Sequence, residues 1–109
     1  MPSKRPGFVV LYRWRLRTGM EDAFVAAWSR VSALLLAERG SLGSRLHRGS
    51  DGIWYSYAQW PSAQARERAF ALPSVDAEAS NAMREAIEES FPEIVLACAA
   101  DFLADAADS

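Results

Sequence analysis

The chain has 109 residues, and 50% of them are hydrophobic, which is enough for one packed domain and too many for a disordered chain. Its formal charge of −2 gives no net positive charge of the kind that binds nucleic acid. Cys98 is the single cysteine, so no intramolecular disulfide can form, and one cysteine with one histidine gives no metal-ligand spacing.

The first half of the sequence predicts a strand, a helix and a second strand. Residues 8–17 alternate between apolar and other side chains, which is the period of a strand. A helix over 21–40 begins with Glu21 and Asp22, which the helix dipole favours, and ends at a glycine suited to a left-handed turn. Residues 42–48 form the second predicted strand.

The second half begins with a turn of composition GSDG over 49–52, followed by the aromatic strand 53–60. Serines at the helix starts predict one helix over 62–71 and another over 74–90, separated by Pro73 and ended by Pro92. The apolar run 94–103 predicts a last strand. Because this run does not alternate, we expect it to be buried on both faces.

This order of elements predicts an α+β fold of the ferredoxin-like type, with helices on one face of a four-stranded antiparallel sheet. We expect one domain over 1–109, with a core of about 7–104 and tails at 1–6 and 105–109. The sheet face away from the helices still carries apolar groups. A second copy of the chain is expected to cover it, which predicts a homodimer that buries over about 1,000 Å².

The aromatic strand divides its side chains between the two faces of the sheet. If 49–52 is a four-residue turn, Arg48 lies opposite Ile53 and His47 lies opposite Trp54. The helix side then carries a pocket of apolar and polar groups, made by Arg45, His47, Trp54, Ser56, Ala58 and Trp60. The opposite face carries Leu42, Ser44, Leu46, Ile53, Tyr55, Tyr57 and Gln59. A register slip of one residue would move one strand's set to the other face.

Each candidate residue also has a purely structural interpretation. His47 is the one side chain expected to titrate near neutral pH, either beside a ligand or simply exposed near the hairpin tip. Trp60 is either a ligand-facing donor or a core residue at the strand end. Trp54 suits a core or dimer surface as well as a pocket, and Arg84 suits a solvated helix face as well as a site.

The segment "LHRGSDGIWYSYAQWPSAQA" resembles the antibiotic biosynthesis monooxygenase family. The element "YAQW", ending at Trp60, is similar to the cofactor-independent anthrone monooxygenases of that family, and "MREAIEESFP" resembles one of their helix ends. The resemblance implies a dimeric α+β barrel that binds a flat phenol between sheet and helices. It also implies chemistry without flavin, haem or metal, in which the substrate loses a proton and its anion reacts with O₂.

The same resemblance implies a set of site residues. Trp60 and His47 match a site tryptophan and histidine, and Arg84 matches a site arginine if about four residues are inserted before its helix. We therefore expect catalytic roles for Trp60, His47 and Arg84, and substrate binding by Arg45, Trp54, Ser56 and Arg66. Two positions depart from the family, which carries asparagine where Ser56 stands and tyrosine where Arg66 stands. The haem-degrading branch is set aside because its ligand positions correspond here to Tyr12, Ala69 and Ala79.

The sequence supports three hypotheses about function. The first is a cofactor-free monooxygenase that oxidises a small aromatic phenol or quinol with O₂. The second is a non-catalytic dimer that binds a small aromatic ligand, and the third is a structural dimer whose cavity is filled by its own side chains. In each case we expect a cytoplasmic protein with no nucleic-acid or membrane partner, because no apolar stretch has the length of a signal peptide or a membrane span.

Overall fold

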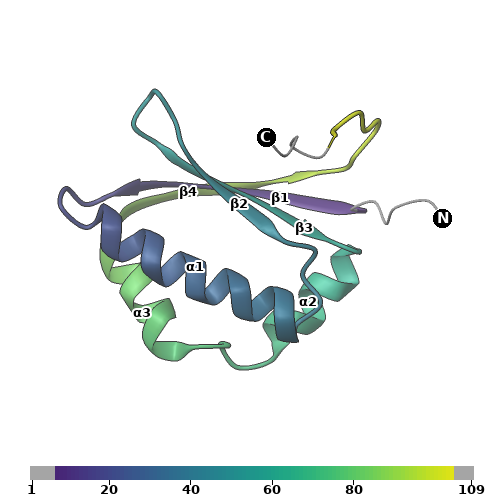
Figure 1. Ribbon diagram of the computed structural model, residues 1–109, viewed down its shortest axis with the longest axis horizontal. Helices are drawn as coiled ribbons and strands as arrows, with labels where there is room; N and C mark the ends of the chain where they lie inside the picture. The colour runs from purple at the N-terminus through teal and green to yellow at the C-terminus, as the bar shows by residue number, and fades with distance from the viewer. Residues whose placement is uncertain (1–6, 105–109) are drawn as a thin grey trace, which may run out of the picture.

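The computed structural model describes residues 7–104, so the predicted tails at 1–6 and 105–109 lie outside the described residues. Its elements in chain order are β1 Phe8–Leu16, α1 Glu21–Glu38, β2 Ser44–Arg48, β3 Trp54–Trp60, α2 Ala63–Ala71, α3 Ala77–Ala86 and β4 Ile87–Leu96. The strands form one antiparallel sheet in the order β2-β3-β1-β4. The three helices all cover one face of this sheet (Figure 1). The α+β, ferredoxin-like prediction is confirmed.

The core lies between the sheet and the helices and is rich in aromatic rings. Phe24 of α1 is completely buried, as is Val10 of β1. The Phe24 ring meets Trp14 edge to face with centroids 5.2 Å apart, and it meets Trp54 in the same way at 6.5 Å. Edge-to-face packing is a favoured arrangement of aromatic pairs. These contacts fix α1 across the two central strands.

Helix α2 begins as the sequence predicts, with Ser62 as its cap. The Ala65 backbone N–H donates to Ser62 Oγ at 3.1 Å, which satisfies one of the amide groups left unpaired at the helix start. At the other end of α2, Arg39, which follows α1, donates through its guanidinium to the Ala69 carbonyl at 3.0 Å and to the Pro73 carbonyl at 2.8 Å. The short helix is therefore held at both its start and its end.

We expect Ser62→Ala to lower the free energy of unfolding by about 1 kcal/mol, because the cap hydrogen bond is lost. Urea denaturation followed by circular dichroism measures the change. Ser62→Thr is the matched control, since it keeps a capping hydroxyl. An alanine variant as stable as the wild type would show that packing alone holds α2.

The boundary between the third helix and the last strand differs from the prediction. Helix α3 ends at Ala86 rather than Ser90, and its cap is Asp76 rather than Ser74, with the Ala79 N–H donating to Asp76 Oδ1 at 2.9 Å. Strand β4 starts at once and runs through Pro92. Proline cannot donate to a strand ladder, but β4 is an edge strand with an irregular register at this point, where proline is tolerated.

The prediction that the last strand is buried on both faces is also wrong. Strand β4 ends at Leu96, and its final residues remain exposed, with Val95 at 55%. The missing alternation of the run reflects an edge strand that continues into an irregular segment, not burial between two layers. That segment turns away from the helices and passes along the other face of the sheet (Figure 1). Within residues 7–104, no helix has the length and apolar character needed to cross a membrane.

Candidate functional site

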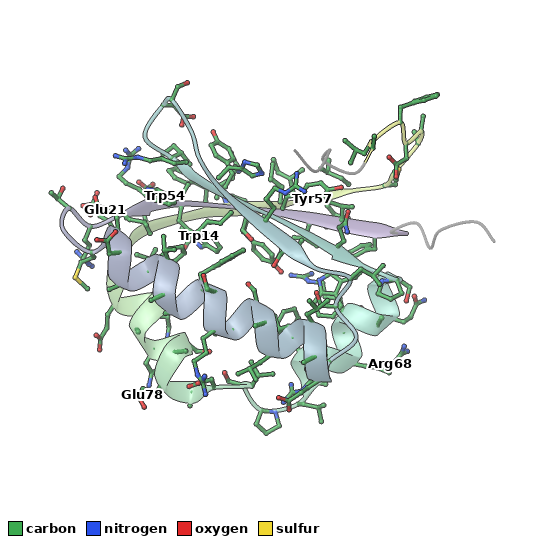
Figure 2. All side chains as sticks on the ribbon, viewed as in Figure 1. Trp14, Glu21, Trp54, Tyr57, Arg68 and Glu78 are labelled. Carbon is green, nitrogen blue, oxygen red and sulfur yellow. The ribbon has the colours of Figure 1, made fainter. Side chains whose placement is uncertain are left out.

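A cavity of about 190 Å³ lies between the helix side of the sheet and the helices. Strands β1, β2 and β3, all three helices and the loop before β2 contribute its lining, which consists of Tyr12, Trp14, Trp28, Val31, Ser32, Leu35, Ser41, Ser44, Ser56, Ala58, Trp60, Phe70 and Met83. Trp14 can be followed between the sheet and α1 in Figure 2. An apolar cavity of about 150 Å³ holds benzene. This cavity therefore has room for a one- or two-ring aromatic group, which argues against the hypothesis of a filled interior.

The β2–β3 hairpin has a register one residue away from the predicted one. Arg48 pairs with Trp54 and His47 with Tyr55. The reason lies in the turn, where the Gly49 N–H donates to the Ile53 carbonyl at 2.7 Å and leaves a loop of three residues rather than four. Because side chains alternate along a strand, this odd loop moves the whole β2 set to the opposite face.

The changed register removes two predicted residues from the pocket. His47 and Arg45 are exposed and share the outer face with Tyr55 and Tyr57. Leu46 moves in the other direction and packs against the buried core. The prediction of His47 and Arg45 on the helix side, and of Leu46 on the outer face, is therefore wrong.

Of the other five predicted residues, Arg66 does not line the cavity but donates to the cavity residue Tyr12, and the remaining four fall into three groups. Trp60 and Ser56 line the cavity. Trp54 lies on the helix side but packs against Phe24, outside the cavity lining. Arg84 is exposed on α3, where its Nη2 donates to Asn81 Oδ1, so it is not placed at the cavity. Its predicted position came from a matched helix end, and the helix stops four residues before the predicted end.

Trp60 is the most deeply buried of the predicted site residues, at 1% exposure. Its ring meets Phe70 edge to face with centroids 5.7 Å apart. Its Nε1 is buried, and no acceptor for it occurs among residues 7–104. Buried donors without a partner are rare in folded proteins. Trp60 therefore combines a ring that lines the cavity with a buried hydrogen-bond donor that no residue of 7–104 uses.

A second tryptophan approaches the same cavity from α1. Trp28 Nε1 donates to Ser56 Oγ at 3.1 Å. Ser56 is 2% exposed, and its own hydroxyl hydrogen is not needed for this bond because the oxygen is the acceptor. Trp28 lies within the helix that the sequence predicts over 21–40, and nothing local distinguishes it from a core side chain.

Tyr12 is a further cavity residue, which the sequence analysis considered only in setting aside the haem-degrading branch. Arg66 Nη2 donates to its hydroxyl oxygen at 2.9 Å. Burial raises the pKa of Tyr12 above its ordinary value of 10.0, and the neighbouring Arg66 opposes this shift without cancelling it. Tyr12 therefore stays protonated at neutral pH. Alternation along the first strand puts it on one face of the sheet, but does not show which face or which polar partner it meets.

The cavity lining contains aromatic, aliphatic and hydroxyl side chains. Among the described residues that line it, none is a carboxylate or an imidazole. No group of three histidine, cysteine, aspartate or glutamate side chains within residues 7–104 could hold a metal ion. The chemistry available at the wall is therefore hydrogen-bond donation to a ligand oxygen inside an apolar enclosure.

Comparison with known proteins gives the family. The model of the antibiotic biosynthesis monooxygenase family matches residues 7–89, while no curated protein matches the sequence. SnoaB, a cofactor-independent oxygenase from Streptomyces nogalater, has a TM-score of 0.74 at 18% identity, over 90% of this chain and 98% of that one. Rv0793 from Mycobacterium tuberculosis has a TM-score of 0.70 at 18% identity, over 88% of this chain and 98% of that one. PA3566 from Pseudomonas aeruginosa has a TM-score of 0.68 at 18% identity, over 91% of this chain and 100% of that one. These structures share the fold, and the chain belongs to the antibiotic biosynthesis monooxygenase family.

Proposed function

We propose that the protein is a cofactor-independent monooxygenase that oxidises a small one- or two-ring phenol to a quinone with O₂. The monooxygenase-type fold and the similarity to SnoaB support this class of reaction. The observation that carries the proposal is the buried Nε1 of Trp60, a donor without a partner among residues 7–104, on a side chain that lines the apolar cavity. Such a donor stabilises a phenolate oxygen more strongly in a dry site than in water.

The reaction balances without an added reductant. A phenolate whose para carbon carries a hydrogen donates electrons to O₂, and a bond forms between that carbon and one oxygen atom. The carbon then loses its proton while the O–O bond breaks, which leaves a carbonyl on the ring and releases hydroxide. The overall change is one phenol plus one O₂ to one quinone plus one water.

The protein's contribution is to bind the anion and to exclude water. Trp60 Nε1 and the Ser56 hydroxyl are the donors that we assign to the ligand oxygen. Among the lining residues within 7–104, none offers a carboxylate or an imidazole as a base, so the phenol proton is assigned to solvent. The rate is therefore expected to rise with pH until the bound phenol is fully ionised, rather than to follow the titration of a histidine.

The test uses phenol and 1-naphthol as one-ring and two-ring probes, with an oxygen electrode and quinone absorbance read on the same sample. We expect one O₂ consumed per quinone formed and, with ¹⁸O₂, one labelled oxygen in each product. Heat-denatured protein and an anaerobic sample are the controls. Oxygen uptake no faster than with denatured protein, for both probes, would reject the proposal.

We expect His47→Ala to leave turnover unchanged, because His47 lies on the outer face of the sheet and is exposed. The measurement is kcat and KM with the best phenol, together with the pH profile of kcat. A fall of tenfold or more in kcat, with the pH profile altered, would instead restore His47 as a proton acceptor, a role that it could then play only from a rearranged hairpin.

A second candidate function is a non-catalytic binder of small aromatic molecules. The absence of a carboxylate or imidazole among the described lining residues favours it, since a binder needs no base. Replacement of the family asparagine by Ser56 points in the same direction. Calorimetric binding of naphthol without any oxygen uptake would select this function over the first.

We also propose that two copies of the chain form a homodimer through the outer face of the sheet. On this face Leu11 lies between Tyr57 of β3 and Ile94 of β4 in the strand pairing, and Phe91 lies opposite Arg13. A second copy would remove this apolar surface from water, which would stabilise the dimer by roughly 25 cal/mol for each Å² of apolar surface buried. The resulting dimer would be the barrel that the family resemblance implies.

A further inference from the structure

Three side chains from different elements, one of them the cavity residue Tyr12, are joined by polar contacts. Arg66 of α2 donates through Nη2 to the Tyr12 hydroxyl of β1 at 2.9 Å, and the same nitrogen lies 2.7 Å from Glu93 Oε2 of β4. The guanidinium also lies over two rings, 5.7 Å from the Tyr12 centroid and 5.4 Å from that of Phe70. Charge and stacking together give Arg66 one well-defined position.

The position of Glu93 depends on an irregularity in β4. The pairing of β1 with β4 passes from Leu11↔Ile94 directly to Arg13↔Phe91, so Pro92 and Glu93 together lie opposite Tyr12. This is a β-bulge, and bulges change the direction of a side chain. The extra residue lets Glu93 reach Arg66, while Arg13 Nη2 donates to the Pro92 carbonyl at 2.9 Å.

The direction of the hydrogen bond leaves one hydrogen of Tyr12 available. Arginine only donates, so the phenol oxygen is the acceptor, and no acceptor for its own O–H occurs among the described residues. Tyr12 lines the cavity. The charged groups that act on it are Arg66 from α2 and Glu93 from β4, and the cavity residues contributed by α1, α3, β2 and β3 are uncharged.

We propose that Glu93 and Arg66 are positioning residues that hold the Tyr12 hydroxyl as a hydrogen-bond donor to an oxygen anion of an aromatic ligand in the cavity. Tyr12 and Trp60 then provide two donors on the wall of one apolar site. The ligand class that this arrangement selects is a phenolate, bound in preference to the neutral phenol of the same shape. The inference rests on the proposed function only in requiring that the cavity bind an aromatic ligand.

The test is a spectroscopic titration with 4-nitrophenol, whose phenol and phenolate forms absorb at different wavelengths. We expect the wild-type protein to bind the phenolate about tenfold more tightly than the phenol, the effect of one hydrogen bond to a charged group, and so to lower the apparent pKa of the bound probe. Tyr12→Phe should remove most of this preference. Glu93→Gln should remove part of it, because Arg66 loses its ion-pair partner.

Glu89→Gln is the matched control. Glu89 lies on the same strand as Glu93, but it forms an ion pair with Arg15 at 3.6 Å and not with Arg66. It should keep the full phenolate preference. An unchanged pKa of the bound probe in both Tyr12→Phe and Glu93→Gln would overturn the inference, as would failure of the wild type to bind the phenolate.

The titration requires no turnover, so it separates this inference from the proposed reaction. A Tyr12-dependent preference for the phenolate without oxygen uptake would support the anion site and reject the oxygenase. Oxygen uptake with no Tyr12-dependent preference would support the oxygenase and reject the role assigned to Tyr12.

Discussion

Trp60→Phe is expected to weaken phenol binding or turnover about tenfold, while the folded protein stays nearly as stable as the wild type. The substitution exchanges one ring for a smaller one and removes Nε1, the buried donor that has no acceptor within residues 7–104. A lost hydrogen bond to a charged oxygen corresponds to roughly 1.5 kcal/mol or more. Calorimetry with naphthol and a thermal melt on the same purified variant measure both quantities.

Trp54→Phe is the matched control for this experiment. Trp54 lies on the same strand and the same side of the sheet, but it packs on Phe24 rather than lining the cavity. We expect it to change stability more than binding. A Trp60→Phe variant with a lowered melting temperature and unchanged affinity would make Trp60 a core residue alone, and the proposed site would lose its main donor.

Tyr57→Asp is expected to convert a homodimer into monomers by weakening association at least a hundredfold. Tyr57 lies on the outer face of the sheet, where it pairs with Leu11 of β1 on one side and with Arg45 of β2 on the other. A carboxylate buried there without a partner costs several kcal/mol, and a two-fold interface contains it twice. Light scattering across micromolar concentrations gives the mass of each form.

Leu36→Asp is the control for the assembly experiment, because Leu36 is 55% exposed on α1, on the helical side of the molecule. It introduces the same charge and should leave the dimer intact. A wild-type protein with monomeric mass at these concentrations, or a Tyr57→Asp variant that remains dimeric, would contradict assembly through the sheet.

The hairpin illustrates how far the sequence alone can predict the site. Alternation correctly assigned Ser56 and Trp60 to the helix side, because the period of a strand is a local property. The position of His47 depended on the pairing of two strands, and this pairing depended on the number of residues in the turn. One residue of difference between a three- and a four-residue loop exchanged the faces of an entire strand. The composition GSDG fits both loops.

Pro92 shows a second limit. Proline after an apolar helix pattern predicts a helix end, and the same residue is accepted within a strand only if that strand lies at the edge of a sheet. Edge position follows from the order of strands, which local sequence does not contain. The contacts among Tyr12, Arg66 and Glu93 were equally hidden, since they join three elements far apart in the chain. The fold class and the family could be predicted from the sequence, because the first depends on the order of the elements and the second on a continuous motif.

The bulge at Pro92 has a consequence for how the sheet can grow. An edge strand with a free row of amide donors invites further strands, and this is the route to fibrils. Strand β4 carries proline, which has no amide hydrogen, and the charged Glu89 three residues before it. The other edge, β2, has five residues, two of them the exposed Arg45 and Arg48. Both edges of the sheet therefore resist strand addition, which favours a closed pair over an open-ended polymer.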